Sequence, residues 1–341
     1  MRAWQVDRHG APCDVLRLVD LEQPVPGPGE VRLSVRAAAI GRPDALMCRG
    51  TYPLTPPLPF VPGQEVCGVV EAVGTGVDLA LGTRLMAVTN FFDGRGGFAE
   101  SAIALAATCF RVPDEMSDVD AAAFRIGFST AWIGLVRRAA LQAGEWLVVL
   151  GAAGGSGAAA VQLGHALGAR VVAVAAGAEK LDLCARLGAE VLVDRTATAV
   201  RDAVLEATDG HGADVVYDPV GGDAATGASR ATAAGGRLLA VGFASGEWAS
   251  ISTPDLVARN ASLLGVYAGG FTEAENDTDH EALLALAAAG RIGGFATAVD
   301  FDQIARTVEL VAGDAVIGKY VARSPGEDFP SKMGTIGPGS S

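Results

Sequence analysis

The sequence predicts an α/β protein in which a β-rich domain is joined to a domain with a parallel sheet and helices on both faces. Residues 1 to about 125 are rich in strand and turn patterns, whereas strand and helix patterns alternate from residue 126 onward. The tripeptide LGA occurs at 167–169 and again at 187–189, each time just before a strand-like run. Strand, helix and strand at this spacing are typical of a parallel sheet, and their repeated alternation outweighs coincidence in an alanine-rich chain.

Three apolar runs in the first part have the composition of β-strands, and turn-forming segments separate them. These runs are VRLSVRAAAI (31–40), EVCGVVEAVG (65–74) and TRLMAV (83–88). Within FVPGQEVCGVV, Gly63 and Gly68 flank the polar pair Gln64 and Glu65. Polar side chains inside such an apolar stretch need partners, so Gln64 faces a metal, a substrate or only the local backbone.

The second part contains the alternating elements of the predicted parallel sheet. Helices are expected at 154–168, which Gly168 closes, and at 178–188. The expected strands are 147–150, 170–174, 190–193, 214–218, 237–242 and 262–267. The last residues, 324–341, are rich in Gly, Pro and Ser and are expected to form a disordered tail.

The composition excludes several classes of function. The 341 residues carry a formal net charge of −13, which argues against binding to nucleic acids or to anionic membranes. No CxxC pair occurs, and neither a signal peptide nor a membrane-spanning segment is expected. The five scattered cysteines therefore favour reduced thiols in a cytoplasmic protein: Cys13, Cys48, Cys67, Cys109 and Cys184.

The segment VVLGAAGGSGAAAVQLG places a glycine-rich turn between a buried strand and a helix. Backbone without Cβ atoms lets a pyrophosphate approach closely, and the N–H groups at the start of the helix favour its negative charge. Although Ala152 alters the usual glycine pattern, the flanking strand and helix favour a dinucleotide site over a simple tight turn. The residues expected at the cofactor are Gly151, Gly154, Gly155, Ser156 and Gly157.

The end of the next strand predicts which dinucleotide binds. Enzymes that use NAD place Asp or Glu there, but this chain has Ala175, Ala176 and Gly177. Lys180 and Arg195 lie shortly after this and the following strand. The missing carboxylate and the nearby cations suit the 2′-phosphate of NADPH, although both side chains are also compatible with a solvated surface.

The order of these motifs resembles the medium-chain dehydrogenase/reductase superfamily, in its zinc-independent NADPH:quinone oxidoreductase branch. The resemblance covers residues 1–323, and its remaining motifs are PFVPGQEVCGVVEAVGTGV, GGFAE, GFSTAW, GADVVYDPVGGD, GGRLLAVGFASGE and VIGKYV. It implies a GroES-like catalytic domain from 1–125 and 268–323 and a Rossmann domain from 126–267. It also places Val241, Gly242 and Phe243 at the cofactor.

Zinc-dependent relatives hold a catalytic metal at positions that match Gly41, Gln64 and Ile126 of this chain. Glycine and isoleucine offer no side-chain ligand, and a lone glutamine is a poor ligand for zinc. The resemblance therefore implies a protein without zinc. Gln64 then donates to a substrate carbonyl or ribose, or it satisfies only local backbone.

Hydride transfer from NADPH to a quinone or an activated alkene needs positioning and a donor near the developing oxyanion. By resemblance, Tyr52 and Thr130 lie near the substrate and the nicotinamide, with a packed loop tyrosine and a helix polar residue as the structural alternatives. Arg42 and Arg125 depart from the family pattern. We expect them at the mouth of a cleft, where they favour acceptors with an anionic tail, unless they form only surface salt bridges.

Two other functions stay open at this stage. One is an enoyl-thioester reductase of the polyketide or fatty-acid type, which shares the fold and the glycine turn. The other is an accessory protein that binds NADPH without turnover. The resemblance also implies a homodimer joined through the strand around SLLGVY (262–267), because an apolar sheet edge needs covering.

Overall fold

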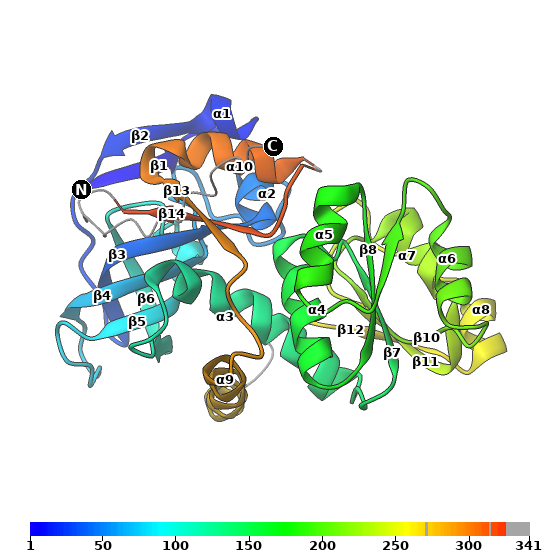
Figure 1. The fold of residues 1–341 in the computed structure, drawn as a ribbon. Coiled ribbons are helices and arrows are strands. Elements are labelled where there is room, and N and C mark those ends of the chain that lie inside the picture. Colours follow the sequence, from blue (N-terminus) through cyan, green and yellow to red (C-terminus); the bar gives the residue numbers. More distant parts are fainter. Residues whose placement is uncertain (270–271, 314, 325–341) are drawn as a thin grey trace, which may run out of the picture.

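The computed structural model describes residues 1–269, 272–313 and 315–324, so the predicted tail beyond Ser324 lies outside the described residues. Two sheets stand on either side of a central helix, α3 (Asp118–Trp132), as Figure 1 shows. The predicted α/β class with one β-rich and one parallel-sheet domain is confirmed.

The β-rich domain is a six-stranded sheet that curls onto itself, with a separate hairpin of β1 and β2. The strand order is β13-β14-β3-β4-β5-β6, and β3 pairs with both β4 and β6. This double pairing closes the sheet around an apolar core. The strands are β1 (Arg2–Val6), β2 (Leu16–Asp20), β3 (Glu30–Ile40), β4 (Glu65–Val73), β5 (Arg84–Thr89), β6 (Ser101–Arg111), β13 (Ala296–Asp300) and β14 (Lys319–Arg323).

Short helices cover the end of this sheet where the chain turns. Helix α2 begins after Gly41, whose N–H donates to the Asp44 carboxylate at 2.8 Å, and it ends at Gly50 in the left-handed region. Helix α10 packs against α1 and α2. The helices of this domain are α1 (Pro12–Val15), α2 (Arg42–Arg49) and α10 (Ile304–Ala312), with single turns η1 (Phe91–Asp93) and η3 (Phe301–Gln303).

The second domain is a six-stranded parallel sheet with the order β12-β11-β10-β7-β8-β9. Strands β8 and β9 lie on one side of β7, and β10, β11 and β12 lie on the other. The strand order thus reverses at β7, and ligands of such sheets bind at the point of reversal. The glycine turn follows β7, so it lies at this switch point. The strands are β7 (Trp146–Leu150), β8 (Arg170–Ala175), β9 (Val191–Asp194), β10 (Ala213–Asp218), β11 (Thr232–Ala240) and β12 (Ser262–Gly265).

Helices cover both faces of the parallel sheet. Leu147 and Val149 point to the face that α4 and α5 cover, whereas Val148 and Leu150 point to the face of α6 and α7. The apolar strands are therefore buried on both sides, as parallel strands require. The helices are α4 (Gly155–Ala166), α5 (Ala178–Arg186), α6 (Val200–Ala207), α7 (Gly222–Ser229) and α8 (Thr253–Arg259).

Helix α3 packs against the sheet of the β-rich domain and against helix α4 of the second domain. It contacts β3, β4 and β5 of one domain and α4 of the other, and it continues into the π-helical turn η2 (Ile133–Arg138). The predicted domain boundary between residues 125 and 126 falls inside this helix. Among the described residues, one helical stretch, Asp118–Arg138, is apolar and long enough to span a membrane, but 67% of its apolar window is buried within the protein. Such burial is usual for a core helix.

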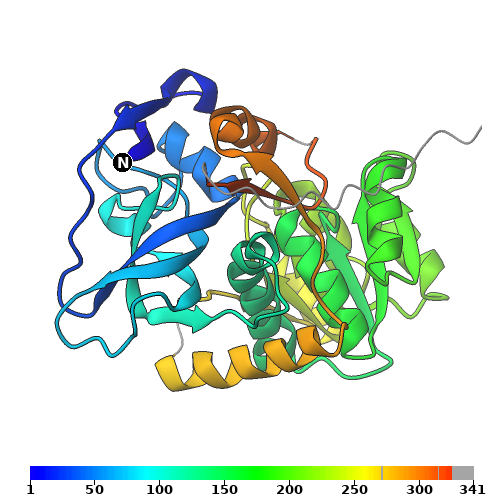
Figure 2. The same cartoon turned by 60° about the vertical axis from the view of Figure 1, so that its left-hand side comes forward.

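The chain returns to the β-rich domain after β12. Helix α9 (Glu273–Ala288) lies along the lower edge of the molecule beside α3, as Figures 1 and 2 show. Residues 289–295 then lead into β13, and β14 completes the sheet. Just before β14, the Gly318 N–H donates to the Ala153 carbonyl at 2.7 Å, so the returning chain touches the glycine turn.

Candidate active site

The glycine turn forms a close backbone cradle between β7 and α4. Gly151 has φ +57, and a Cβ atom at Gly157 would lie 2.3 Å from the Gly151 oxygen. Glycine is therefore required at both positions. The first N–H groups of α4 have no acceptor within the helix and favour an anion. Ser156 Oγ lies 2.9 Å from the hydroxyl of buried Tyr217, which fixes the start of the helix on β10.

The ends of β8 and β9 lie side by side where the adenosine end of a dinucleotide would reach. The Arg195 N–H donates to the Ala175 carbonyl at 2.9 Å, and Gly177 precedes α5 with φ +86. Lys180 is half-buried in the first turn of α5, and Arg195 is exposed. The structure therefore brings both predicted cations to the same sheet edge.

An acidic residue that the sequence argument missed also stands at this edge. The Asp194 carboxylate accepts hydrogen bonds from the Thr196 hydroxyl at 2.7 Å and the Thr196 N–H at 2.9 Å. These bonds, followed by the Gly177 N–H, lower the pKa of Asp194. Its negative charge would oppose part of the attraction of Lys180 and Arg195 for a phosphate bound at this edge.

The segment after β11 is held against the end of β10. The Val241 and Gly242 N–H groups donate to the Asp218 carbonyl at 2.9 and 3.2 Å, and the Phe243 ring lies 4.7 Å from that of Trp248. Asp218 is fully buried; its Oδ1 accepts from two turn N–H groups, and its Oδ2 has no hydrogen-bond partner in the part of the chain that the structure describes. Burial raises the pKa of Asp218.

On the side of the β-rich domain, Gln64 and Tyr52 lie next to each other. Gln64 is 8% exposed, and its Nε2 has no hydrogen-bond partner among the described residues. Burial raises the pKa of the Tyr52 hydroxyl, and the neighbouring Gln64 amide partly opposes this rise. The Gln64 amide therefore lies close to the Tyr52 phenol, but the two groups do not form a well-aligned hydrogen bond. Tyr267, which the sequence argument did not single out, is near enough to influence the same pKa.

Two buried carboxylates lie beside this pair. Asp44 accepts from the N–H groups of Gly41 at 2.8 Å and Gly63 at 3.0 Å. Glu65, which is 1% exposed, accepts from the Ile126 N–H at 2.8 Å and from Lys319 Nζ at 3.1 Å. Complete burial raises the pKa of Asp44 to about 6.

Lys319 connects these carboxylates to the glycine turn. Its aliphatic stem would lie 3.0 Å from a Cβ atom at Gly155, while its ammonium group reaches Glu65. The preceding residue, Gly318, bonds to Ala153. The cradle for a dinucleotide and the Gln64–Tyr52 pair are therefore held at neighbouring places. Thr130, in α3, donates its hydroxyl to the Ile126 carbonyl at 2.7 Å.

Comparisons with known proteins agree with this arrangement. Residues 27–114 match the model of the alcohol dehydrogenase GroES-like domain, and residues 155–290 match that of the zinc-binding dehydrogenase family. A quinone oxidoreductase-like protein 2 homolog from Nematostella vectensis is 38% identical over 249 residues, which is 72% of this chain and 67% of the relative. Human quinone oxidoreductase is 30% identical over 78% of this chain and 80% of its own length.

The chain belongs to the medium-chain dehydrogenase/reductase superfamily, and its relatives are quinone oxidoreductase-like proteins. A mycobacterial member solved in complex with NADPH superposes with a TM-score of 0.87 at 30% identity, covering 95% of this chain and all of that one. A quinone oxidoreductase from Pseudomonas syringae gives 0.86 at 28%, covering 94% and 99%. The GroES-like and Rossmann assignments of the two domains are thus confirmed.

The three positions that match zinc ligands in other members of the superfamily do not form a zinc site. Gly41 has no side chain, Ile126 uses its N–H for Glu65, and Gln64 turns its amide toward Tyr52. No group of three or more His, Cys, Asp or Glu side chains able to hold a metal occurs in the described part of the chain. The donor set does not fit zinc.

Arg42 and Arg125 lie in different helices and in different surroundings. Arg42 is half-buried at the start of α2. Arg125 is 8% exposed, donates to Ser129 Oγ and lies 4.3 Å above the ring of Phe110, next to His280. This burial corrects the expectation that Arg125 lies at the mouth of a cleft, because α9 and β6 cover its charge.

The pH dependence of stability tests the environment of Asp44. Its pKa is about 6 in the folded protein and 3.8 ordinarily, so its contribution is fully present below pH 4 and is lost as the pH rises through 6. The Asp44→Asn variant lacks this titration. From pH 4 to pH 7, the free energy of unfolding of this variant should rise on the order of 2–3 kcal/mol relative to that of wild type, since each pKa unit corresponds to about 1.4 kcal/mol. Urea unfolding of both proteins at the two pH values measures this change. If the stability difference between variant and wild type is the same at pH 4 and pH 7, the prediction is wrong.

Proposed function

We propose that the protein is a zinc-independent reductase that transfers a hydride from NADPH to a quinone or an activated alkene such as an enone. The observation that carries the proposal is a pair of contacts: the Gly318 N–H donates to the glycine turn at Ala153, and the next residue, Lys319, donates to Glu65. These contacts fix the glycine turn beside the Gln64–Tyr52 pair. The names of the relatives and the NADPH bound to a similar structure support the same reaction class.

The residues present fit a dinucleotide phosphate. The open backbone of Gly151 and Gly157 and the N–H groups at the start of α4 would hold the pyrophosphate. Lys180 and Arg195 would face the 2′-phosphate, and residues 241–243 would lie along the nicotinamide half. When bound, NADPH supplies the hydride, and the fold's contribution is to bind, orient and shield it.

Two side chains of the β-rich domain then act on the acceptor. The Tyr52 phenol has an ordinary pKa of 10.0, which burial raises further, so it is protonated near neutral pH and can donate to a carbonyl oxygen that gains negative charge. Gln64 Nε2 is buried and has no acceptor within the described ranges, and a substrate oxygen would provide one. Half-buried Arg42 is a candidate contact for an anionic substituent of the acceptor.

The Tyr52→Phe variant tests this role. Removing a donor to a developing oxyanion lowers rates by about 10²-fold or more, so kcat/KM for 1,4-benzoquinone should fall by about that factor. The dissociation constant of NADPH, measured by fluorescence, should remain unchanged. Tyr320→Phe in β14 serves as the matched control and should keep the wild-type rate. An unaltered rate in Tyr52→Phe would remove the tyrosine from the mechanism.

An enoyl-thioester reductase is the second candidate. The observation in its favour is a polyketide synthase subunit of Mycobacterium tuberculosis, 33% identical over 239 residues, although the match covers 11% of that much longer protein. Comparing kcat/KM for a quinone, an enone and an enoyl thioester with NADPH separates the candidates, with NADH as the control cofactor. Binding of NADPH without oxidation by any acceptor would instead favour the accessory protein.

Cofactor preference tests the predicted phosphate contacts. Each charge-assisted hydrogen bond contributes roughly 1.5–3 kcal/mol, so Lys180→Ala combined with Arg195→Ala should reduce the preference for NADPH over NADH by about 100-fold. The ratio of kcat/KM values for the two cofactors measures it. Arg201→Ala in α6, whose partner is the neighbouring Asp202, is the control. A ratio unchanged by the double substitution would exclude both side chains from the phosphate site.

We also infer a cytoplasmic homodimer joined through β12, the edge strand of the parallel sheet. Leu263 in this strand is 43% exposed and Tyr267 just after it is 63% exposed, and exposed apolar edges are usually covered. Light scattering should give twice the chain mass of 34.5 kDa for wild type. Leu263→Lys should shift the mass to that of one chain, and a monomeric wild type refutes the dimer.

A further inference from the structure

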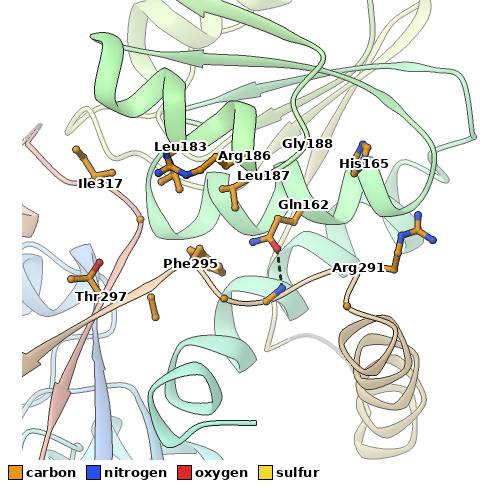
Figure 3. A pocket seen from close by; sticks show the side chains of 15 residues that line it. Gln162, His165, Leu183, Arg186, Leu187, Gly188, Arg291, Phe295, Thr297 and Ile317 are labelled. Atoms are coloured by element: carbon orange, nitrogen blue, oxygen red, sulfur yellow. Dashed lines mark hydrogen bonds between the residues drawn. The ribbon is translucent and has the colours of Figure 1, made fainter. Parts of the chain in front are cut away.

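A recess of about 640 Å³ lies apart from the candidate active site. Its walls are the C-terminal halves of α4 and α5 and the returning segment 290–297, as Figure 3 shows. No residue of the glycine turn lines it, although Gly318 does. The volume is within the range of small-molecule sites in proteins.

One buried amide in this recess lacks an acceptor. Gln162 is 5% exposed, and its Oε1 accepts from the Gly293 N–H at 2.8 Å, the dashed line of Figure 3. Its Nε2 has no hydrogen-bond partner among the described residues. A buried amide of this kind costs free energy until an oxygen atom accepts from it. Gln162 therefore favours a ligand that carries an acceptor oxygen.

The charged residues of the recess also favour a ligand with an acceptor oxygen, in particular an anion. Arg186 and Arg291 line it, and none of the described lining residues is Asp or Glu, although the chain as a whole has a net charge of −13. Arg291 also donates to the Ala166 carbonyl at 2.9 Å, at the end of α4. The two helix ends contribute about half a negative charge each, which two guanidinium groups outweigh. The recess therefore attracts anions.

Part of the remaining lining is apolar, beside glycines, His165 and Thr297. Leu183 and Leu187 project from α5, and Phe295 faces them from the returning segment (Figure 3). Apolar walls with a few polar groups are typical of sites for small organic molecules. We propose that this recess is a second binding site, which takes a small molecule with a carboxylate on an apolar body. The carboxylate binds to an arginine and the Gln162 amide, and the apolar body packs on the leucines and Phe295.

Octanoate is a probe of this chemistry. Calorimetric titration into the NADPH-saturated protein should show one site, and octanamide, which has the same body without the charge, should bind at least 10-fold more weakly. Arg186→Gln combined with Arg291→Gln should weaken octanoate at least 10-fold, as should Gln162→Leu. Arg201→Gln, on α6, is the matched control and should bind as wild type does.

Three outcomes overturn the proposal. The first is no binding of octanoate to wild type up to about 10 mM, a concentration that detects even millimolar affinity. The second is equal affinity in wild type and the double arginine variant, with only the melting temperature reduced, which assigns the arginines to the helix ends alone. The third is competition of octanoate with the quinone acceptor, which places the ligand in the active site. The first two measurements do not depend on which acceptor is reduced, and the third rests on the proposed function.

Discussion

The buried carboxylate of Glu65 is the constraint on which the candidate site depends. It is 1% exposed, so it must be paired, because leaving a buried charge without its partner costs about 3–5 kcal/mol. Its partners are the Ile126 N–H of α3 and the ammonium of Lys319 in β14. Three segments that are distant in sequence are therefore fixed at one point. Gln64 precedes this carboxylate, and the Lys319 stem lies over Gly155, so the acceptor side and the cofactor cradle are positioned together.

The same scaffold suits the proposed reaction, in which hydrogen-bond donors would act on the acceptor in place of a metal. Asp44 and Glu65 are both buried there, and Lys319 is the cation that acts on both. Burial, and to a smaller extent the negative charge of Glu65, raises the pKa of Asp44 to about 6. An acceptor that gains negative charge in such surroundings needs hydrogen-bond donors close to it. The proposed function assigns this role to the Tyr52 phenol, whose pKa burial raises, and to the Gln64 amide, whose Nε2 has no hydrogen-bond partner among the described residues.

Features set by local backbone chemistry could be predicted from the sequence. The glycine turn and the alternating strands are examples, since both depend on residues that are neighbours in the chain. The Lys319–Glu65 ion pair joins residues 254 positions apart, and no local pattern indicates it. The signal available was that Glu65 stands in an apolar run and needs a partner. Asp194 was missed for another reason, because the carboxylate expected for NAD was sought at the end of β8 and this one ends β9.

Arg125 shows how a residue outside the site determines its geometry. On a helix, positions four apart share a face, so Arg125 and Ser129 lie on one face of α3 while Ile126 and Thr130 lie on the next. Arg125 donates to Ser129 and stacks on Phe110, beside a neutral His280 whose pKa is lowered to about 3 by burial and then by Arg125. Burying this face fixes the rotation of α3. That rotation directs the Ile126 N–H to Glu65, so the arginine acts on the geometry of the site through the helix.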